Sequence, residues 1–213
     1  MDQETKFRVV CIGDSITEGF GLGDDPSVYY PSLLQEFLGD DFVVFNEGVT
    51  SSCVTMMEDD EGRTFGLPYV LQPEYDEALS LAGDIYIIML GTNDMKTVYN
   101  ASPDAIANGL NEIVSKAESV MNIKQGFVPK ILVVSPPEIS TDILTGPFSG
   151  SFDQVSIDKS KRLAEYYKKV ADKHGCMFLD AKQYIKPSVE DGLHLGPDGH
   201  KGLAEIIAKT ILG

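Results

Sequence analysis

Three segments of the sequence hold the residue types that acyl transfer requires. Ser15 ends a Gly-Asp-Ser sequence after an apolar run, and its hydroxyl is a weak nucleophile until a base takes its proton. Asp191 precedes His194 by three residues, a spacing that lets the carboxylate bind Nδ1–H and leave Nε2 free as that base. Asn93 follows another apolar run and offers uncharged N–H donors to an oxyanion. Together the segments predict nucleophilic catalysis at a serine.

Each segment alone also has an ordinary structural explanation. Ser15 could cap a short helix, Asn93 could bind its own turn, and an Asp-x-x-His pair could be an exposed loop. The combination favours catalysis, because parallel strands bring the residues that follow them to one edge of a sheet.

Five short apolar runs predict the buried strands that would do this, and each is followed by Gly, Asn, Ser or Asp. The predicted strands are Phe7–Ile12, Phe42–Phe45, Ile85–Leu90, Ile131–Val134 and Met177–Leu179.

Helical periodicity alternates with these runs. Strands alternating with helices predict one α/β domain over residues 1–213, with a parallel sheet covered on both faces. A long Pro- and Gly-containing loop is expected over Ser135–Asp153, near the active edge. The predicted helices are Pro103–Met121, Ser156–His174 and one from Pro197, with shorter ones over Tyr30–Leu38 and Tyr69–Leu81 that Pro31 and Pro73 interrupt.

Composition limits the classes of function. The chain has 213 residues, 43% hydrophobic and 23% charged, as in folded globular proteins. With 17 Lys and Arg residues against 33 Asp and Glu residues, the formal net charge is −16. This charge disfavours nucleic acid and anionic lipid as partners. We expect no export signal, no membrane span and a cytoplasmic protein. The cysteines are Cys11, Cys53 and Cys176, an odd number without Cys-x-x-Cys spacing, so no disulfide framework is expected. The few histidines do not have the spacing of a metal site, so no bound metal is expected.

The three segments, in this order, resemble the first, third and fifth sequence blocks of the SGNH (GDSL) hydrolase family. The resemblance covers essentially the whole chain. It implies a three-layer α/β/α, flavodoxin-like fold with a five-stranded parallel sheet, and ester hydrolysis without a cofactor. It implies Ser15 as nucleophile, His194 as general base, Asp191 as the residue that orients it and Asn93 as an oxyanion donor. Residues 62–64, 87–96 and 135–137 resemble the arylesterase-like subgroup in particular.

The second block departs from the family pattern. Many members have an asparagine followed by a turn to a glycine, whose N–H joins the oxyanion hole. When this pattern is aligned with Asn46–Ser51, Ser51 stands at the position of that glycine. A backbone donor needs no particular side chain, so the N–H groups of Ser51 and Ser15 are expected to complete the hole with Asn93. Gly48 is the alternative to Ser51.

Other reactive residue types have more ordinary interpretations. His200 is expected at the surface or in a cap, and His174 at a helix end that favours a cation. Cys53 is expected to be packed, and Asp14 to hold the turn beneath the serine. The acidic run 58–61 is expected to be a solvated loop.

The main hypothesis is a serine esterase that cleaves short-chain acetyl or aryl esters through an acyl-enzyme. The loop Ser135–Asp153 and the insertion Cys53–Leu67 are expected to wall the acyl pocket, with Phe65, Phe148 and Phe152 available to line it. A carbohydrate O-acetyl esterase, or an acyltransferase or perhydrolase, uses the same parts. A non-catalytic module that binds a small ligand is the remaining alternative. The expected partner is a small-molecule ester, and the arylesterase-like resemblance hints at a homo-oligomer.

Overall fold

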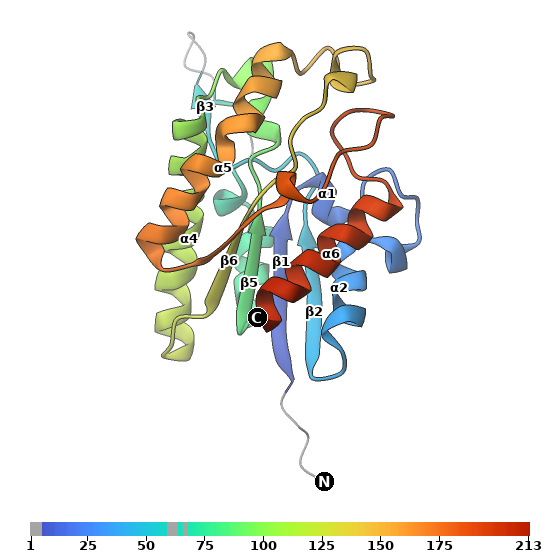
Figure 1. The fold of residues 1–213 in the computed structure, drawn as a ribbon. Coiled ribbons are helices and arrows are strands. Elements are labelled where there is room, and N and C mark those ends of the chain that lie inside the picture. Colours follow the sequence, from blue (N-terminus) through green and yellow to red (C-terminus); the bar gives the residue numbers. More distant parts are fainter. Residues whose placement is uncertain (1–5, 59–63, 66–67) are drawn as a thin grey trace.

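A parallel sheet of five strands forms the centre of the protein, in a computed structural model that describes residues 6–58, 64–65 and 68–213. The strands lie in the order β2, β1, β5, β6, β7 (Figure 1). Numbered along the chain, this is the flavodoxin-like order 2-1-3-4-5, so the predicted fold class is confirmed. The strands are β1 (Phe7–Gly13), β2 (Phe42–Gly48), β5 (Ile85–Met89), β6 (Lys130–Ser135) and β7 (Met177–Asp180).

Helices cover both faces of this sheet (Figure 1). In β1, Val9 and Cys11 pack in the core beneath α2 and α6, whereas Val10 and Ile12 pack in the core beneath α3, α4 and α5. Both faces are apolar because alternate side chains of a strand point to opposite sides. The helices are α2 (Tyr30–Leu38), α3 (Pro73–Ser80), α4 (Pro103–Gln125), α5 (Gln154–His174) and α6 (Pro197–Leu212).

Two prolines that were expected to interrupt predicted helices lie in the first turns of helices. Pro31 lies in the first turn of α2 and Pro73 in the first turn of α3. A residue in the first turn has no intrahelical acceptor for its N–H, so proline removes no hydrogen bond there. The interruption predicted at Pro31 is therefore wrong, whereas the helix predicted over Tyr69–Leu81 is divided just before Pro73 into a 3₁₀ turn, η2 (Tyr69–Leu71), and α3.

Caps explain where the long helices begin and end. Ser102 accepts a hydrogen bond from the N–H of Ala105 and starts α4, which continues four residues past the predicted end, to Gln125, and is capped by Gly126. Asp153 forms a capping box with Ser156, so α5 starts two residues earlier than predicted. The left-handed Gly175, at φ 67°, ends α5.

Short elements occupy the connections. The strands β3 (Met57–Glu58) and β4 (Thr64–Phe65) pair antiparallel inside the insertion Cys53–Leu67. Residues 59–63, with most of the acidic run and Gly62 and Arg63, lie outside the described residues, as do 66–67. The remaining short helices are α1 (Ser15–Glu18) and the 3₁₀ turns η1 (Pro26–Val28), η2 (Tyr69–Leu71), η3 (Asn93–Met95), η4 (Thr97–Tyr99), η5 (Thr141–Leu144) and η6 (Ala181–Gln183).

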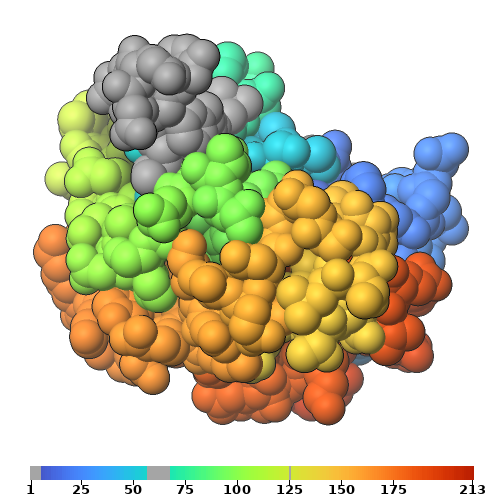
Figure 2. Space-filling model, turned by 90° about the horizontal axis from the view of Figure 1, so that it is seen from above, coloured from blue at the N-terminus to red at the C-terminus, as the bar shows by residue number. Residues whose placement is uncertain are grey.

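The carboxyl ends of the strands face the viewer in Figure 2. There the segments after β5 and after β6 lie side by side, and Thr97 donates its N–H to the carbonyl of Ser151 at 2.9 Å. Within the described ranges, no helix combines the length and apolar character needed to cross a bilayer.

Candidate active site

Ser15 lies at the turn where β1 gives way to α1, at the carboxyl edge of the sheet. Asp14 caps α1, and its Oδ1 accepts the N–H of Ile16 at 3.1 Å. The end of β2 passes close to this turn: a Cβ added to Gly48 would lie 2.3 Å from the backbone N of Glu18. Asp14 therefore holds the turn as predicted, and the local backbone packing requires glycine at position 48.

The His194 ring lies between Ser15 and Asp191. Ser15 Oγ is 2.9 Å from Nε2, although the two residues are 179 positions apart, and Asp191 Oδ2 is 2.7 Å from Nδ1. An anionic Asp191 can only accept, so Nδ1 carries the ring proton and Nε2 accepts the serine hydroxyl. All three residues are less than a tenth exposed. This is the arrangement in which imidazole can take a proton from serine.

Backbone contacts hold the loop that carries this pair. The other carboxylate oxygen of Asp191 accepts the N–H groups of Leu193 at 2.8 Å and His194 at 2.9 Å. The carbonyl of His194 accepts the N–H of Ser188 at 2.7 Å, and that of Gly192 accepts the N–H of Ser140 at 3.0 Å. The loop after β6 thus supports the segment before α6.

Asn93 begins η3, just beyond the end of β5, and is 5% exposed. Its Nδ2 donates to the carbonyl of Ser52 at 2.9 Å. That bond uses one amide hydrogen and orients the group, and the second hydrogen remains for another acceptor. Sequence reasoning missed the role of Ser52, because a backbone carbonyl leaves no signal in residue type.

Ser51 has left-handed backbone geometry, with φ 68°. This is the region that glycine adopts readily, so Ser51 has a conformation that favours glycine. No acceptor for its N–H is found among the described residues, whereas the N–H of Gly48 donates to Asn46 Oδ1 at 3.0 Å. Of the two alternatives, Ser51 has the N–H that is free to donate.

Two buried carboxyl groups lie close to the candidate site. Burial raises the pKa of Asp14 to about 7, opposed by the N–H of Ile16 and reinforced by the charge of Asp94. Burial also raises the pKa of Asp94, which accepts the N–H groups of Val54 and Thr55. Asp94 therefore ties the segment after Ser51 to the turn that carries Asn93.

Two phenylalanines contact the His194 ring. Phe20, which follows α1, has its ring centroid 4.5 Å from the imidazole centroid, and Phe148, in the loop after β6, lies at 5.4 Å. Sequence reasoning anticipated Phe148 near the site but missed Phe20. The expectation that Phe152 is available to line the pocket is wrong, because its side chain is 2% exposed and packs in the core. The side chain of Phe65 is not among those described.

His200 is buried, which corrects its expected surface position. Its Nδ1 accepts the N–H of Tyr30 at 3.0 Å, and burial lowers its pKa to about 4. It therefore acts as a neutral acceptor that joins α6 to α2. His174 ends α5 as predicted and contacts Glu118 at 2.8 Å. Cys53 is fully buried, and its thiol donates to the carbonyl of Thr55.

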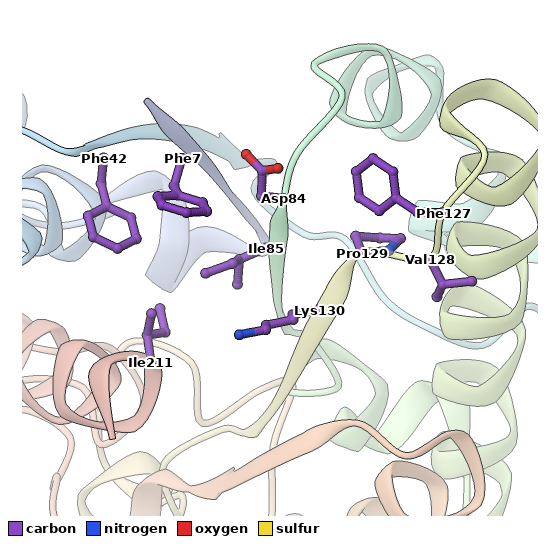
Figure 3. A pocket seen from close by; sticks show the side chains of 9 residues that line it. All are labelled: Phe7, Phe42, Asp84, Ile85, Phe127, Val128, Pro129, Lys130 and Ile211. Atoms are coloured by element: carbon purple, nitrogen blue, oxygen red, sulfur yellow. The ribbon is translucent and has the colours of Figure 1, made fainter. Parts of the chain in front are cut away.

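A pocket of about 360 Å³ lies away from these residues, at the amino ends of the strands (Figure 3). Phe7, Phe42, Phe127 and Lys130 are among its lining residues, and none of the candidate catalytic side chains reaches it. In the part of the chain that the structure describes, no three His, Cys, Asp or Glu side chains gather closely enough to hold a metal ion.

Comparison with known sequences identifies the family. The sequence profile of the GDSL-like lipase/acylhydrolase family matches residues 11–201. An acetylxylan esterase of Xylanibacter ruminicola is 28% identical over 228 aligned residues, which cover 98% of this chain but 44% of that protein. The chain thus spans less than half the length of this relative.

Solved structures share the whole fold. A carbohydrate acetylesterase from Sinorhizobium meliloti, Est24, superimposes with a TM-score of 0.82 at 29% identity, covering 97% of this chain and 99% of that one. The aryl esterase of M. smegmatis gives a TM-score of 0.81 at 26% identity, with coverages of 97% and 98%. The predicted resemblance to this family of hydrolases is confirmed.

Proposed function

This chain belongs to the GDSL-like lipase/acylhydrolase family, and on that premise we propose that it is a serine esterase that removes short acyl groups, acetyl above all, through an acyl-enzyme on Ser15. The observation that carries the proposal is the 2.9 Å contact between Ser15 Oγ and His194 Nε2, with Asp191 on the opposite side of the ring. A hydroxyl bonded to an oriented imidazole is an activated nucleophile.

The reaction proceeds in two halves. Ser15 Oγ attacks the ester carbonyl carbon while His194 Nε2 takes the hydroxyl proton, and the carbonyl oxygen becomes an anion. His194 then returns the proton to the leaving alkoxide, so the alcohol departs and the acyl group stays on Ser15. Water, deprotonated by the same imidazole, attacks the acyl-enzyme, and His194 returns that proton to Ser15 Oγ as the acid leaves. Asp191 stabilises the imidazolium formed in each half without itself being protonated.

The oxyanion is held by three N–H donors, from Asn93 Nδ2 and the backbones of Ser51 and Ser15. The contact of Asn93 with the Ser52 carbonyl supports its role, since it directs the amide before substrate arrives. The second donor is supported by the φ of 68° at Ser51 and by its N–H, which has no acceptor among the residues that the structure describes. Ser15 begins α1, where N–H groups have no intrahelical acceptor. Preorganised donors of this kind lower the barrier because they need no rearrangement during reaction.

A carbohydrate O-acetyl ester is the second candidate substrate. It is favoured by the two similar proteins described as an acetylxylan esterase and a carbohydrate acetylesterase. Aryl acetates are favoured by the aryl esterase and by the aromatic side chains of Phe20 and Phe148 beside His194. Both candidates share the acetyl group and differ only in the alcohol that leaves.

Hydrolysis assays separate the candidates and test the proposal. We expect kcat/KM for p-nitrophenyl esters to fall as the acyl chain lengthens beyond acetate, and Ser15→Ala to abolish hydrolysis of every ester in the series. A panel of acetylated sugars, assayed beside the aryl acetates, identifies the preferred alcohol. Product analysis with added alcohol or peroxide measures acyl transfer to acceptors other than water. Unchanged hydrolysis by Ser15→Ala would refute the proposal, because the acyl group would then have no nucleophile.

A further inference from the structure

Two phenylalanine rings contact the catalytic imidazole proposed above. The Phe20 and His194 rings are separated by 4.5 Å between centroids and inclined by 34°, a close tilted contact. Phe148 meets the same imidazole at 5.4 Å and 60°, and the two phenylalanine rings lie 6.2 Å apart. Phe20 and Phe148 together are called the aromatic cover.

Phe20 is 45% exposed, although large apolar side chains gain free energy when they are buried. Its neighbour Gly19 has φ 97°, and a Cβ at Gly19 would lie 2.5 Å from the Tyr29 ring. The chain therefore leaves α1 through a turn that requires glycine, and this turn carries Phe20 to the imidazole. Phe20 thus covers the imidazole while part of its own surface stays open to solvent.

The face of a phenylalanine ring carries partial negative charge and attracts a cation within about 6 Å of its centroid. A neutral imidazole gains little from this field, but the imidazolium that forms when His194 takes the serine proton gains more. An interaction that strengthens on the way to the transition state raises kcat.

We propose that Phe20, assisted by Phe148, stabilises the imidazolium form of His194 during acyl transfer, and that Phe20 is therefore a positioning residue of the reaction. This inference rests on the proposed role of His194 as the base. It assigns the aromatic cover an electrostatic role in addition to that of a pocket wall.

The other groups that face His194 define what a titration would report. Asp191 contacts Nδ1, the Ser15 hydroxyl contacts Nε2, and His200 interacts electrostatically from α6. His200 has a pKa lowered to about 4 by burial, so it stays neutral across the pH range of an esterase assay. Asp14, with a pKa near 7, titrates within that range but does not contact the ring. A site-specific signal from His194 is therefore needed beside the rate profile.

The test replaces Phe20 with leucine, which keeps apolar bulk and removes the aromatic face. We expect the acid limb of kcat/KM and the NMR titration midpoint of the His194 ring to move to lower pH by about 0.4 to 1.5 units. The same interaction predicts a fall in kcat of about 2- to 30-fold. Phe148→Leu should move both quantities in the same direction by less, because its ring lies farther from the imidazole.

Phe127→Leu is the matched control, since Phe127 is 47% exposed and lies at the opposite end of the sheet (Figure 3). It should leave the titration and kcat unchanged. A titration midpoint of His194 that stays constant or rises in Phe20→Leu would overturn the proposal, even if KM changed. The NMR readout needs no turnover, so a protein that proved not to be an esterase would be distinguished from one whose aromatic cover has no electrostatic effect.

Discussion

Asp191 contacts His194 twice, through the ring Nδ1 at 2.7 Å and through the backbone N–H at 2.9 Å. The same carboxylate thus sets both the position of the loop and the protonation of the ring. Replacement by asparagine separates these two effects, because an amide oxygen can still accept the backbone N–H groups while the amide nitrogen can only donate to Nδ1.

We therefore expect Asp191→Asn to fold normally and to lose roughly 10³- to 10⁴-fold in kcat, since Nδ1 must then accept and the proton moves to Nε2. Asp198→Asn, an exposed substitution in the first turn of α6, is the control and should keep wild-type activity. Thermal unfolding measured beside the kinetics separates loss of activity from loss of fold. Activity within tenfold of wild type in Asp191→Asn would contradict the role of Asp191.

Asn93→Ala removes one proposed oxyanion donor. We expect kcat to fall by roughly 10² to 10³ while KM changes little, because the donor acts on charge that develops only in the transition state. The exposed Asn108→Ala on α4 should have no effect. A rise in KM with unchanged kcat would instead assign Asn93 to substrate binding.

Ser51 should tolerate glycine, since its N–H is the proposed donor and its φ of 68° is one that glycine adopts without strain. We expect Ser51→Gly to keep activity within a few-fold and to unfold at the same or a higher temperature. Ser51→Val should lower stability by about 1 to 2 kcal/mol, because β-branched residues are strained at positive φ. A tenfold loss of kcat in a stably folded Ser51→Gly would show that the hydroxyl takes part.

Asp14 predicts how stability depends on pH. Its folded pKa of about 7 lies above the ordinary value near 3.8, so between these values the folded state holds a proton that the unfolded state releases. Its contribution to stability is therefore complete below pH 3.8 and declines as pH rises through 7. We expect Asp14→Asn to show less loss of unfolding free energy than wild type between pH 4 and 8, measured by denaturant titration. An identical pH slope in the two proteins would contradict the raised pKa.

Sequence patterns located the strands and the chemistry of the site more precisely than the contacts around it. Each buried strand is a short apolar run, and a hydroxyl, an amide and an imidazole follow these runs, so residue type alone directs attention to them. Pro31 was misread because a proline's effect depends on whether it lies in the first turn of a helix, whereas Pro73 does mark a break in the predicted helix.

Other features depend on tertiary contacts that residue type does not encode. The burial of His200 follows from the packing of α6 against α2. The acceptor for Asn93 is the backbone carbonyl of Ser52, a group that every residue type has. The approach of Phe20 to His194 joins residues far apart in the chain. Whether the substrate carries an aryl group or a sugar also depends on tertiary contacts, those that shape the pocket.

Covalent labelling with a fluorophosphonate tests the central claim most directly, because the reagent reacts preferentially with a serine that a neighbouring base has activated. Mass mapping of the labelled protein should place one tag on Ser15, and His194→Ala should prevent labelling while leaving thermal unfolding close to that of wild type. A tag on any other residue with Ser15 unmodified, or undiminished labelling of Ser15 in His194→Ala, would contradict the account.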